Sequence, residues 1–384
     1  MEFGWTDAEE EFRARIQHAF ATHARPGWTH HDRDMPTAKD RDDSIAFCQA
    51  LAKEQLLTPH WPEEYGGRSA SGWEQAILGE EAWGSGEPRG PQYMNVNWIG
   101  PAIIYAGTQE QKDYHLSRIG QGNVLWCQGF SEPDAGSDLA SLRTAAVRDG
   151  DEYVVNGQKC WTSYAHEAEY IFLLCRTDPK AERHAGISIL LVPMNTPGIE
   201  VREIPSPYAA HLVHEVFFTD VRVPVSCRLG PENEGWTTIM TVLANERAGW
   251  VTHENTFRRL DTLLDQPDID AADPDTAATA GRAYAMAEAT KMLNFLAIDE
   301  RENTEPGKRR TIAPVGQAAL GLLEPAVGWA IHEISGMEAL DVDSIAGRSM
   351  VSMTASPIAA GAIEIQFNLI AKQTLQLPKE GRPA

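Results

Sequence analysis

The hydrophobic periodicity of the chain changes twice, near Asn123 and near residue 230. Before Asn123, apolar residues recur at helical spacing, as from Phe12 to Phe20, and short breaks containing Gly or Pro separate the helices. Thr6 with Glu9 predicts a capping box at the start of the first helix. After it, short β-rich runs alternate with turn signals such as Asn156-Gly157 until helical periodicity returns. The sequence therefore predicts an α+β protein with a helical domain over residues 1–122, a β domain over 123–230 and a second helical domain over 231–384.

The charge and cysteine content narrow the possible classes of function. The formal net charge is −22, which opposes non-specific contact with nucleic acid or anionic membranes but still allows a local site for an anionic ligand. The five cysteines are widely spaced and form no C-x-x-C pair, so we expect neither a disulfide framework nor a zinc site. No apolar run approaches the roughly eighteen residues of a membrane span. We expect a cytoplasmic protein that binds neither nucleic acid nor membrane.

A carboxylate lies on the apolar face of the helix that is predicted from about Trp236. Ile239, Leu243 and Trp250 share that face with Glu246. Burial raises the pKa of a carboxyl group towards neutrality, which suits a general base. The spacing by itself favours the other interpretation, a structural Glu held by an Arg from a neighbouring helix.

Two segments of the β region have the composition of a ligand site. Residues 129–144, GFSEPDAGSDLASLRT, end a strand in a turn of small and hydroxyl residues, where backbone amides can approach a planar or anionic ligand. Such a sequence also fits an ordinary Asx-rich turn. In NGQKCWTS, two-residue alternation predicts Trp161 and Ser163 on one face of a strand, where they could flank a flat cofactor. A half-buried Trp in a β domain is more often part of the core.

A series of motifs resembles the acyl-CoA dehydrogenase family over nearly the whole chain. In order they are WPEEYGG, GTQEQKDYHLSRIGQG, CQGFSEPDAGSDLASLRT, DEYVVNGQKCWTS, FFTDVRVP and EIQFNLIAK. The resemblance implies an N-terminal helical domain, a middle β domain and a C-terminal four-helix bundle, with FAD between the last two. It also implies an acyl-CoA substrate and an electron-transfer flavoprotein or similar acceptor.

The resemblance assigns roles to individual β-domain residues. Gln128, Phe130 and Ser131 match the strand that contacts the flavin ring. Trp161 and Ser163 match the residues that flank the ring and bond its N5 edge, and Ser137 matches a contact to the pantetheine arm. No metal is implied.

The position of the base distinguishes two branches of the family. The commonest branch has a Glu before a Gly in the last helical region, whereas this chain has Ala359-Ala360-Gly361-Ala362 there. A second branch has its Glu before an Arg on the first long helix of the C-terminal domain, which Glu246-Arg247 match. The resemblance therefore implies that Glu246 removes the pro-R α proton as the β hydride passes to flavin N5. Arg247 and Ala360 are expected at the substrate, with the Ala360 N–H bonding the thioester oxygen.

Two departures from the family pattern concern the part of the FAD site that crosses subunits. The usual G-G-T-x-E-I-Q-R reads Gly361 to Phe367 here, without its hydroxyl and cation, and no R-x-x-F-G is recognisable between Arg309 and Gln317. This asymmetry resembles the heteromeric acyl-CoA dehydrogenases of bacterial steroid side-chain degradation, in which unlike subunits share each FAD. It implies a heterotetramer, or else a homotetramer, acting on a bulky acyl-CoA. The alternatives are a catalytically silent partner subunit, which the altered C-terminal motif favours, and a flavin monooxygenase of the same fold, which Glu246 opposes.

Overall fold

The computed structural model describes residues 4–29, 32–206, 212–246, 251, 253–305, 311–342, 344–359 and 361–378. The chain forms two compact units, and each contains segments that are distant in the sequence. The first, the helical unit, comprises Met1–Phe20, Ser71–Glu87 and Ala244–Ala384. The second, the β unit, comprises Ala21–Ala70 and Pro88–Leu243. The predicted α+β class is confirmed, with N-terminal helices, a middle β-sheet and C-terminal helices. The three-domain boundaries stay a prediction.

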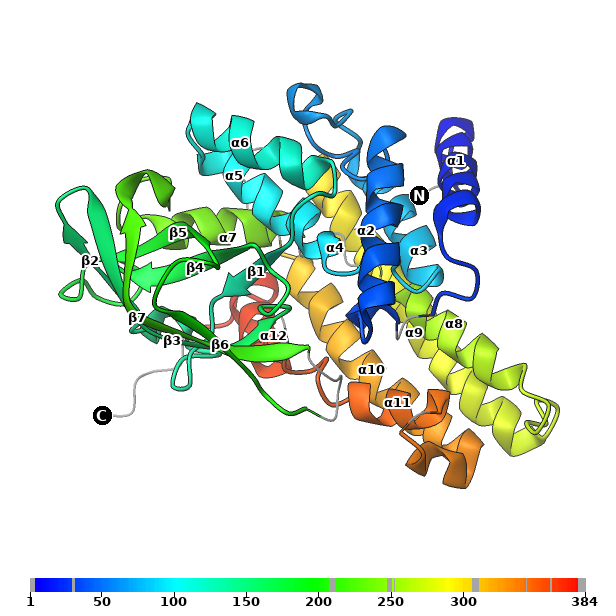
Figure 1. The fold of residues 1–384 in the computed structure, drawn as a ribbon. Coiled ribbons are helices and arrows are strands. Elements are labelled where there is room, and N and C mark those ends of the chain that lie inside the picture. The colour runs from blue at the N-terminus through cyan, green and yellow to red at the C-terminus, as the bar shows by residue number, and fades with distance from the viewer. Residues whose placement is uncertain are drawn as a thin grey trace, which may run out of the picture. The chain divides into compact units, whose positions relative to one another are not determined.

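Long helices make up the helical unit, where α8, α9 and α10 run side by side (Figure 1). Their shared core contains Leu260 and Leu263 of α8, Ala287 of α9, and Leu323 and Val327 of α10, all fully buried. The helices are α1 (Asp7–His23, which continues into the β unit), α3 (Gly72–Gly84), α8 (His253–Leu264), α9 (Pro274–Asn303), α10 (Ala313–Ser335), α11 (Ile345–Ser352) and α12 (Ile363–Leu369). As predicted from the sequence, Thr6 and Glu9 form a capping box that begins α1.

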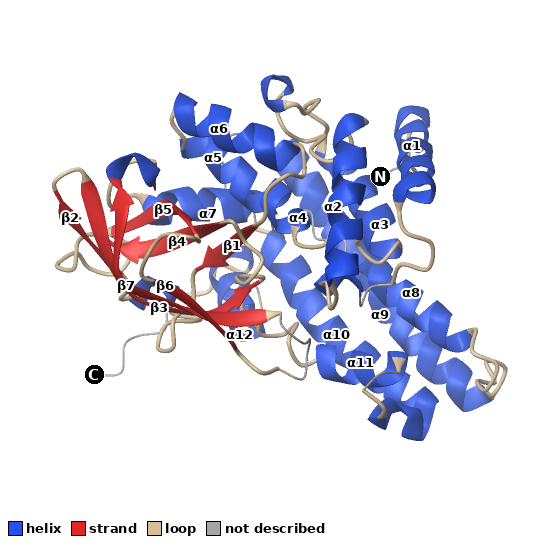
Figure 2. Cartoon of the chain, viewed as in Figure 1, coloured by secondary structure: helices blue, strands red, loops and turns tan. Residues whose placement is uncertain are grey.

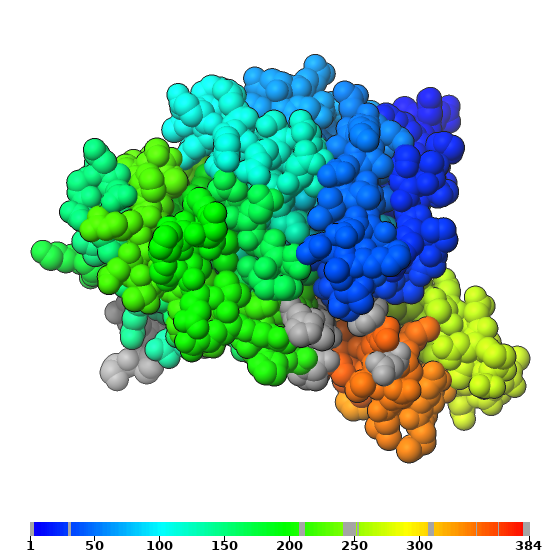
Figure 3. Space-filling view, viewed as in Figure 1, coloured from blue at the N-terminus to red at the C-terminus, as the bar shows by residue number. Residues whose placement is uncertain are grey.

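The helices of the β unit include one irregular segment. A π-helical turn, Asn95–Ile99, lies between α4 and α5, and the Trp61 indole N–H donates to the Val96 carbonyl at 2.8 Å. The Cys48 thiol of α2 donates to the Arg89 carbonyl, and Figure 3 shows the surface of α2 (blue) adjoining that of residues 88–120 (cyan). The helices are α2 (Ala38–Lys53), α4 (Gln92–Met94), α5 (Gly100–Ala106), α6 (Gln109–Gly120) and α7 (Gly235–Glu246, whose last residues enter the helical unit).

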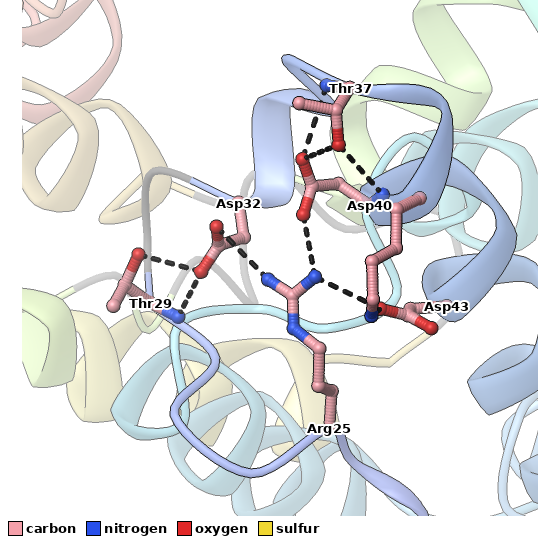
Figure 4. Close-up of polar contacts among 7 residues, drawn as sticks. Arg25, Thr29, Asp32, Thr37, Asp40 and Asp43 are labelled. Carbon is pink, nitrogen blue, oxygen red and sulfur yellow. Dashed lines mark hydrogen bonds and ion pairs between the residues drawn. The ribbon is translucent and has the colours of Figure 1, made fainter.

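Arg25 organises the connection between α1 and α2 (Figure 4). Its guanidinium group bonds Asp40 at 2.7 Å and Asp43 at 2.9 Å, and lies 3.1 Å from Asp32. Asp40 in turn forms a capping box with Thr37 at the start of α2. One cation therefore fixes the connecting segment against the first turns of the following helix.

In the part of the chain that the structure describes, the sheet has eight strands in the order β6-β7-β3-β2-β4-β5-β8, with β1 paired in parallel to β4 (Figure 2). β4 is buried on both faces, as its sequence YIFLLCR requires, whereas β7 alternates between buried and less buried residues. The strands are β1 (Trp126–Gly129), β2 (Ala145–Asp149), β3 (Glu152–Ser163), β4 (Tyr170–Arg176), β5 (Ile187–Pro193), β6 (Ile199–Glu203), β7 (Val213–Pro224) and β8 (Arg228–Leu229). Among the described residues, no helix is long and apolar enough to cross a membrane.

Candidate active site

A β-bulge changes the direction of the side chains near the end of β3. Lys159 pairs with Val216 of β7, and Thr162 pairs with His214, so Cys160 and Trp161 together oppose a single residue. Lys159 is fully buried, whereas Trp161 is 63% exposed. Strict two-residue alternation would put these two side chains on the same face. The bulge therefore turns Trp161 outward while Lys159 stays in the core.

The backbone of Trp161 is strained. Its φ is +58°, a left-handed conformation that costs a bulky residue about 1–3 kcal/mol. Because the indole is largely exposed, burial of its apolar surface offsets little of that cost. Strain of this kind persists where the surrounding structure enforces it, and it is concentrated at ligand sites. Thr162 is buried and Ser163 half-buried, so Trp161 and Ser163 share the less buried side of β3.

The segment after β1 lies beside this bulge. The Cys160 N–H donates to the Ser131 carbonyl at 2.9 Å, which places Ser131 next to the start of the bulge. Gln128 pairs with Phe172 of β4, and the Phe130 ring packs edge-on against the Phe172 ring at 6.0 Å. The structure thus brings the segment from Gln128 to Ser131 together with the Trp161–Ser163 end of β3. An exposed indole at this position offers a flat aromatic surface on which a planar heterocycle can stack.

A buried ion pair joins this segment to β3. The Lys159 ammonium donates to Glu132 Oε1 at 2.8 Å and to the Phe130 carbonyl at 3.0 Å. The Glu132 carboxylate also accepts the backbone N–H groups of Arg143, at 2.6 Å, and Thr144, at 2.9 Å. One carboxylate therefore links the two ends of residues 130–144, which we call the site loop, to the core of the sheet.

The surroundings of the ion pair stabilise the charged form of the Glu132 carboxyl group. Burial alone would raise the pKa of Glu132, but the Lys159 ammonium and the hydrogen bonds from Thr144 and Arg143 outweigh it and hold that pKa below its ordinary value. Burial lowers the pKa of Lys159, and the Glu132 carboxylate opposes that shift. Our sequence reasoning missed both residues. The available signal was a lysine within a predicted strand and a glutamate in the turn of small residues that begins at Gly129.

The remaining predicted site residues lie either on the exposed part of the site loop or outside the described residues. Ser137 lies on the exposed part of the site loop, between the two ends held by Glu132. Glu246 ends α7, but its side chain, together with Arg247 and Ala360, lies outside the described residues. Their roles stay predictions from the family motifs.

Among the described residues, a cluster in the helical unit has the spacing of metal ligands. Glu80, His253 and Glu254 of the helical unit present ligand atoms within 4.8 Å of one another. The Lys291 ammonium lies 3.2 Å from Glu254 and 3.6 Å from Glu80, and Arg13 bonds Glu80 at 2.7 Å. Protein cations therefore already neutralise these carboxylates, and we interpret the cluster as structural.

Comparisons with known proteins agree with the fold. The acyl-CoA dehydrogenase N-terminal domain model matches residues 6–123, and the middle-domain model matches residues 127–221. Acyl-CoA dehydrogenase IpdE1 of Mycobacterium tuberculosis is 33% identical, over 97% of this chain and 99% of its own length. The chain belongs to the acyl-CoA dehydrogenase family and is an oxidoreductase of that family.

Two solved structures are similar over almost the entire chain. The ChsE4–ChsE5 complex from Mycobacterium tuberculosis superposes with a TM-score of 0.86 at 30% identity, covering 99% of this chain and 100% of the other. The structure described as the Tcur3481–Tcur3483 steroid acyl-CoA dehydrogenase gives a TM-score of 0.84 at 30% identity, with the same coverage. The resemblance to the steroid-degrading branch of the family is confirmed.

Proposed function

We propose that this chain catalyses the FAD-dependent α,β-dehydrogenation of an acyl-CoA thioester to a trans-2-enoyl-CoA. The observation that most directly supports a flavin site is Trp161, an exposed indole that a bulge and a strained backbone turn away from the core. Family membership specifies the class of reaction. FAD, when bound, supplies the hydride acceptor.

The residues of this chain would bind and orient the reactants. Gln128, Phe130 and Ser131 would contact the flavin ring, with Trp161 against its face and Ser163 at its edge. On the substrate side, Ser137 would contact the pantetheine arm of the thioester. These assignments follow the family motifs and agree with the contact between the Cys160 N–H and the Ser131 carbonyl.

Proton removal is assigned to Glu246. Abstraction of a proton α to a thioester needs a carboxylate base, and donors at the thioester oxygen stabilise the enolate charge as it develops. The Ala360 N–H would be such a donor, and Arg247 would lie beside the substrate. Ala359-Ala360 stand where another branch of the family has its Glu, which leaves Glu246 as the candidate base.

Changing Glu246 to Gln tests this assignment. We expect the variant to bind flavin normally, because Gln preserves the shape of the side chain. Anaerobic bleaching of flavin absorbance by acyl-CoA should slow by about a hundredfold or more, because an amide does not accept the proton. Glu234→Gln, on the exposed turn before α7, is the matched control and should bleach at the wild-type rate. Unchanged bleaching in Glu246→Gln would place the base elsewhere.

The partner and the substrate are further parts of the proposal. The changed C-terminal motif and the similarity to the ChsE4–ChsE5 complex support a heteromer in which a related chain completes the FAD site. A bulky, ring-bearing acyl-CoA is the substrate class that we propose, from the similarity to a steroid acyl-CoA dehydrogenase. Transfer of the electrons from the reduced flavin to an electron-transfer flavoprotein or similar acceptor would complete the cycle.

Expression alone and with a homologous partner chain tests the assembly. We expect flavin uptake to be incomplete alone and stoichiometric in the heteromer, with bleaching by ring-bearing acyl-CoAs. A tetramer of this chain alone with four tightly bound FAD would exclude the heteromer. Full flavin uptake without bleaching, whatever the acyl-CoA or partner, would instead support a silent subunit, which the altered C-terminal motif favours.

A further inference from the structure

The site loop is closed by one buried carboxylate. Glu132 accepts the N–H groups of Arg143 and Thr144 at one end of the loop, while its ion-pair partner Lys159 bonds the Phe130 carbonyl at the other end. Glu132 and Ala135 also exchange backbone hydrogen bonds, which makes a tight turn directly after the carboxylate. Gly136, Ser137 and Asp138, directly after this turn, are exposed, whereas Ala140 and Leu142 further along the loop are buried. The conformation of the exposed part therefore depends on bonds made in the core.

Stability alone does not require an ion pair at this position. Lys159 is fully buried and Glu132 is 9% exposed, so both charges lose most of their hydration. Burial of that kind costs several kcal/mol per ion, and an apolar pair of similar volume often gives equal or greater stability. What an apolar pair does not provide is directional bonds to backbone groups. Three such bonds converge here, from Lys159 to the Phe130 carbonyl and from the Arg143 and Thr144 N–H groups to Glu132, beside the ion pair itself.

We propose that Glu132 and Lys159 are positioning residues that hold the flavin contacts and the acyl-CoA contact of the site loop in one fixed arrangement. Lys159 directly precedes the bulge, and the next residue, Cys160, bonds the Ser131 carbonyl. Movement of the pair would therefore displace Ser131 and Trp161 on one side and Ser137 on the other. The roles of those three residues rest on the proposed function, whereas the fixing of the loop does not.

The experiment compares single and double variants of the full-length chain. Glu132→Gln and Lys159→Met each leave one buried charge without its partner, and the double variant E132Q/K159M removes both. Arg222→Met is the control, because it removes an exposed ion pair with Asp149 and Glu152 from the same sheet. Amide hydrogen exchange at Arg143 and Thr144 is measured without flavin, alongside urea unfolding. FAD affinity, acyl-CoA KM and kcat are then measured on the heteromer.

We expect the single variants to be destabilised and the double variant to recover most of the wild-type stability. In the double variant, exchange at Arg143 and Thr144 should remain about tenfold faster than in the wild type, because the charge-assisted bonds are absent. The FAD dissociation constant and the acyl-CoA KM should both rise about tenfold, with kcat changing less. Arg222→Met should match the wild type in every measurement.

Two results would overturn the proposal. Wild-type exchange at Arg143 and Thr144 in a stable double variant would show that the pair does not hold the loop. Faster exchange with unchanged FAD affinity and KM would show that the loop does not position the ligands. If the wild-type chain binds neither FAD nor acyl-CoA with any partner, the proposed function fails, and the exchange comparison still decides whether the pair fixes the loop.

Discussion

The two units each bury a glutamate, but the partners of the two carboxylates differ. In the helical unit, Glu80 of α3 faces Arg13 of α1, His253 of α8 and Lys291 of α9, all through side chains. In the β unit, Glu132 has one cationic partner among the described residues, Lys159, and accepts bonds from two backbone amides. A carboxylate bonded by side chains joins helices to one another. One bonded by backbone amides determines the path of a loop, which is what a ligand site requires.

Removal of Glu80 should have the largest effect. Glu80→Ala leaves the charges of Arg13 and Lys291 without their shared carboxylate and removes the carboxylate that faces His253, and we expect a loss of about 3–5 kcal/mol in the free energy of unfolding. Urea denaturation measures it. Glu81→Ala is the control, since Glu81 also bonds Arg13 but is more exposed. Equal losses in the two variants would contradict the central role of Glu80.

Acidification should weaken both carboxylate sites. Burial by itself would raise the pKa of Glu80, but His253, Arg13 and Lys291 outweigh it and lower that pKa, as Lys159 and the loop amides do for Glu132. A lowered folded-state pKa stabilises the protein fully above the unfolded value of about 4.3. That contribution is lost as pH falls through the lower, folded-state value. Urea unfolding between pH 7 and 3 should show the loss, and Glu80→Gln should flatten the profile.

Substitution of Trp161 should lower flavin affinity without lowering the free energy of unfolding. Glycine adopts a φ of +58° without strain, so Trp161→Gly should leave the free energy of unfolding unchanged or raise it by about 1 kcal/mol. Flavin affinity should fall, because the indole is lost. Urea denaturation and flavin titration measure the two effects. A large loss of stability would show that the indole is a structural residue.

The exposed ion pair of Arg222 should have the smallest effect. Its side chain is 56% exposed, and both of its acidic partners are also exposed. Water and salt screen such pairs, so Arg222→Met should not measurably change the urea midpoint. If Arg222→Met lowered the urea midpoint as much as Lys159→Met, the exposed ion pair of this sheet would contribute as much to stability as the buried one, which would contradict the comparison.

The sequence alone determined the order of helices, β domain and helices, because hydrophobic periodicity follows from which face of each element is buried. It also determined the capping box at Thr6, which depends on residues only three apart. The ordered motifs identified the family and the segments around Ser131 and Trp161.

Tertiary structure decided how those segments are held. Alternation along β3 puts Lys159 and Trp161 on the same face, and only the pairing with β7 introduces the bulge that separates them. The bond between Lys159 and Glu132 joins residues that are 27 positions apart in the chain. Its effect on the loop depends on burial of both side chains, which no local sequence pattern specifies. Local periodicity indicates which residues become buried on folding. The partners they find there depend on how distant strands and loops pack.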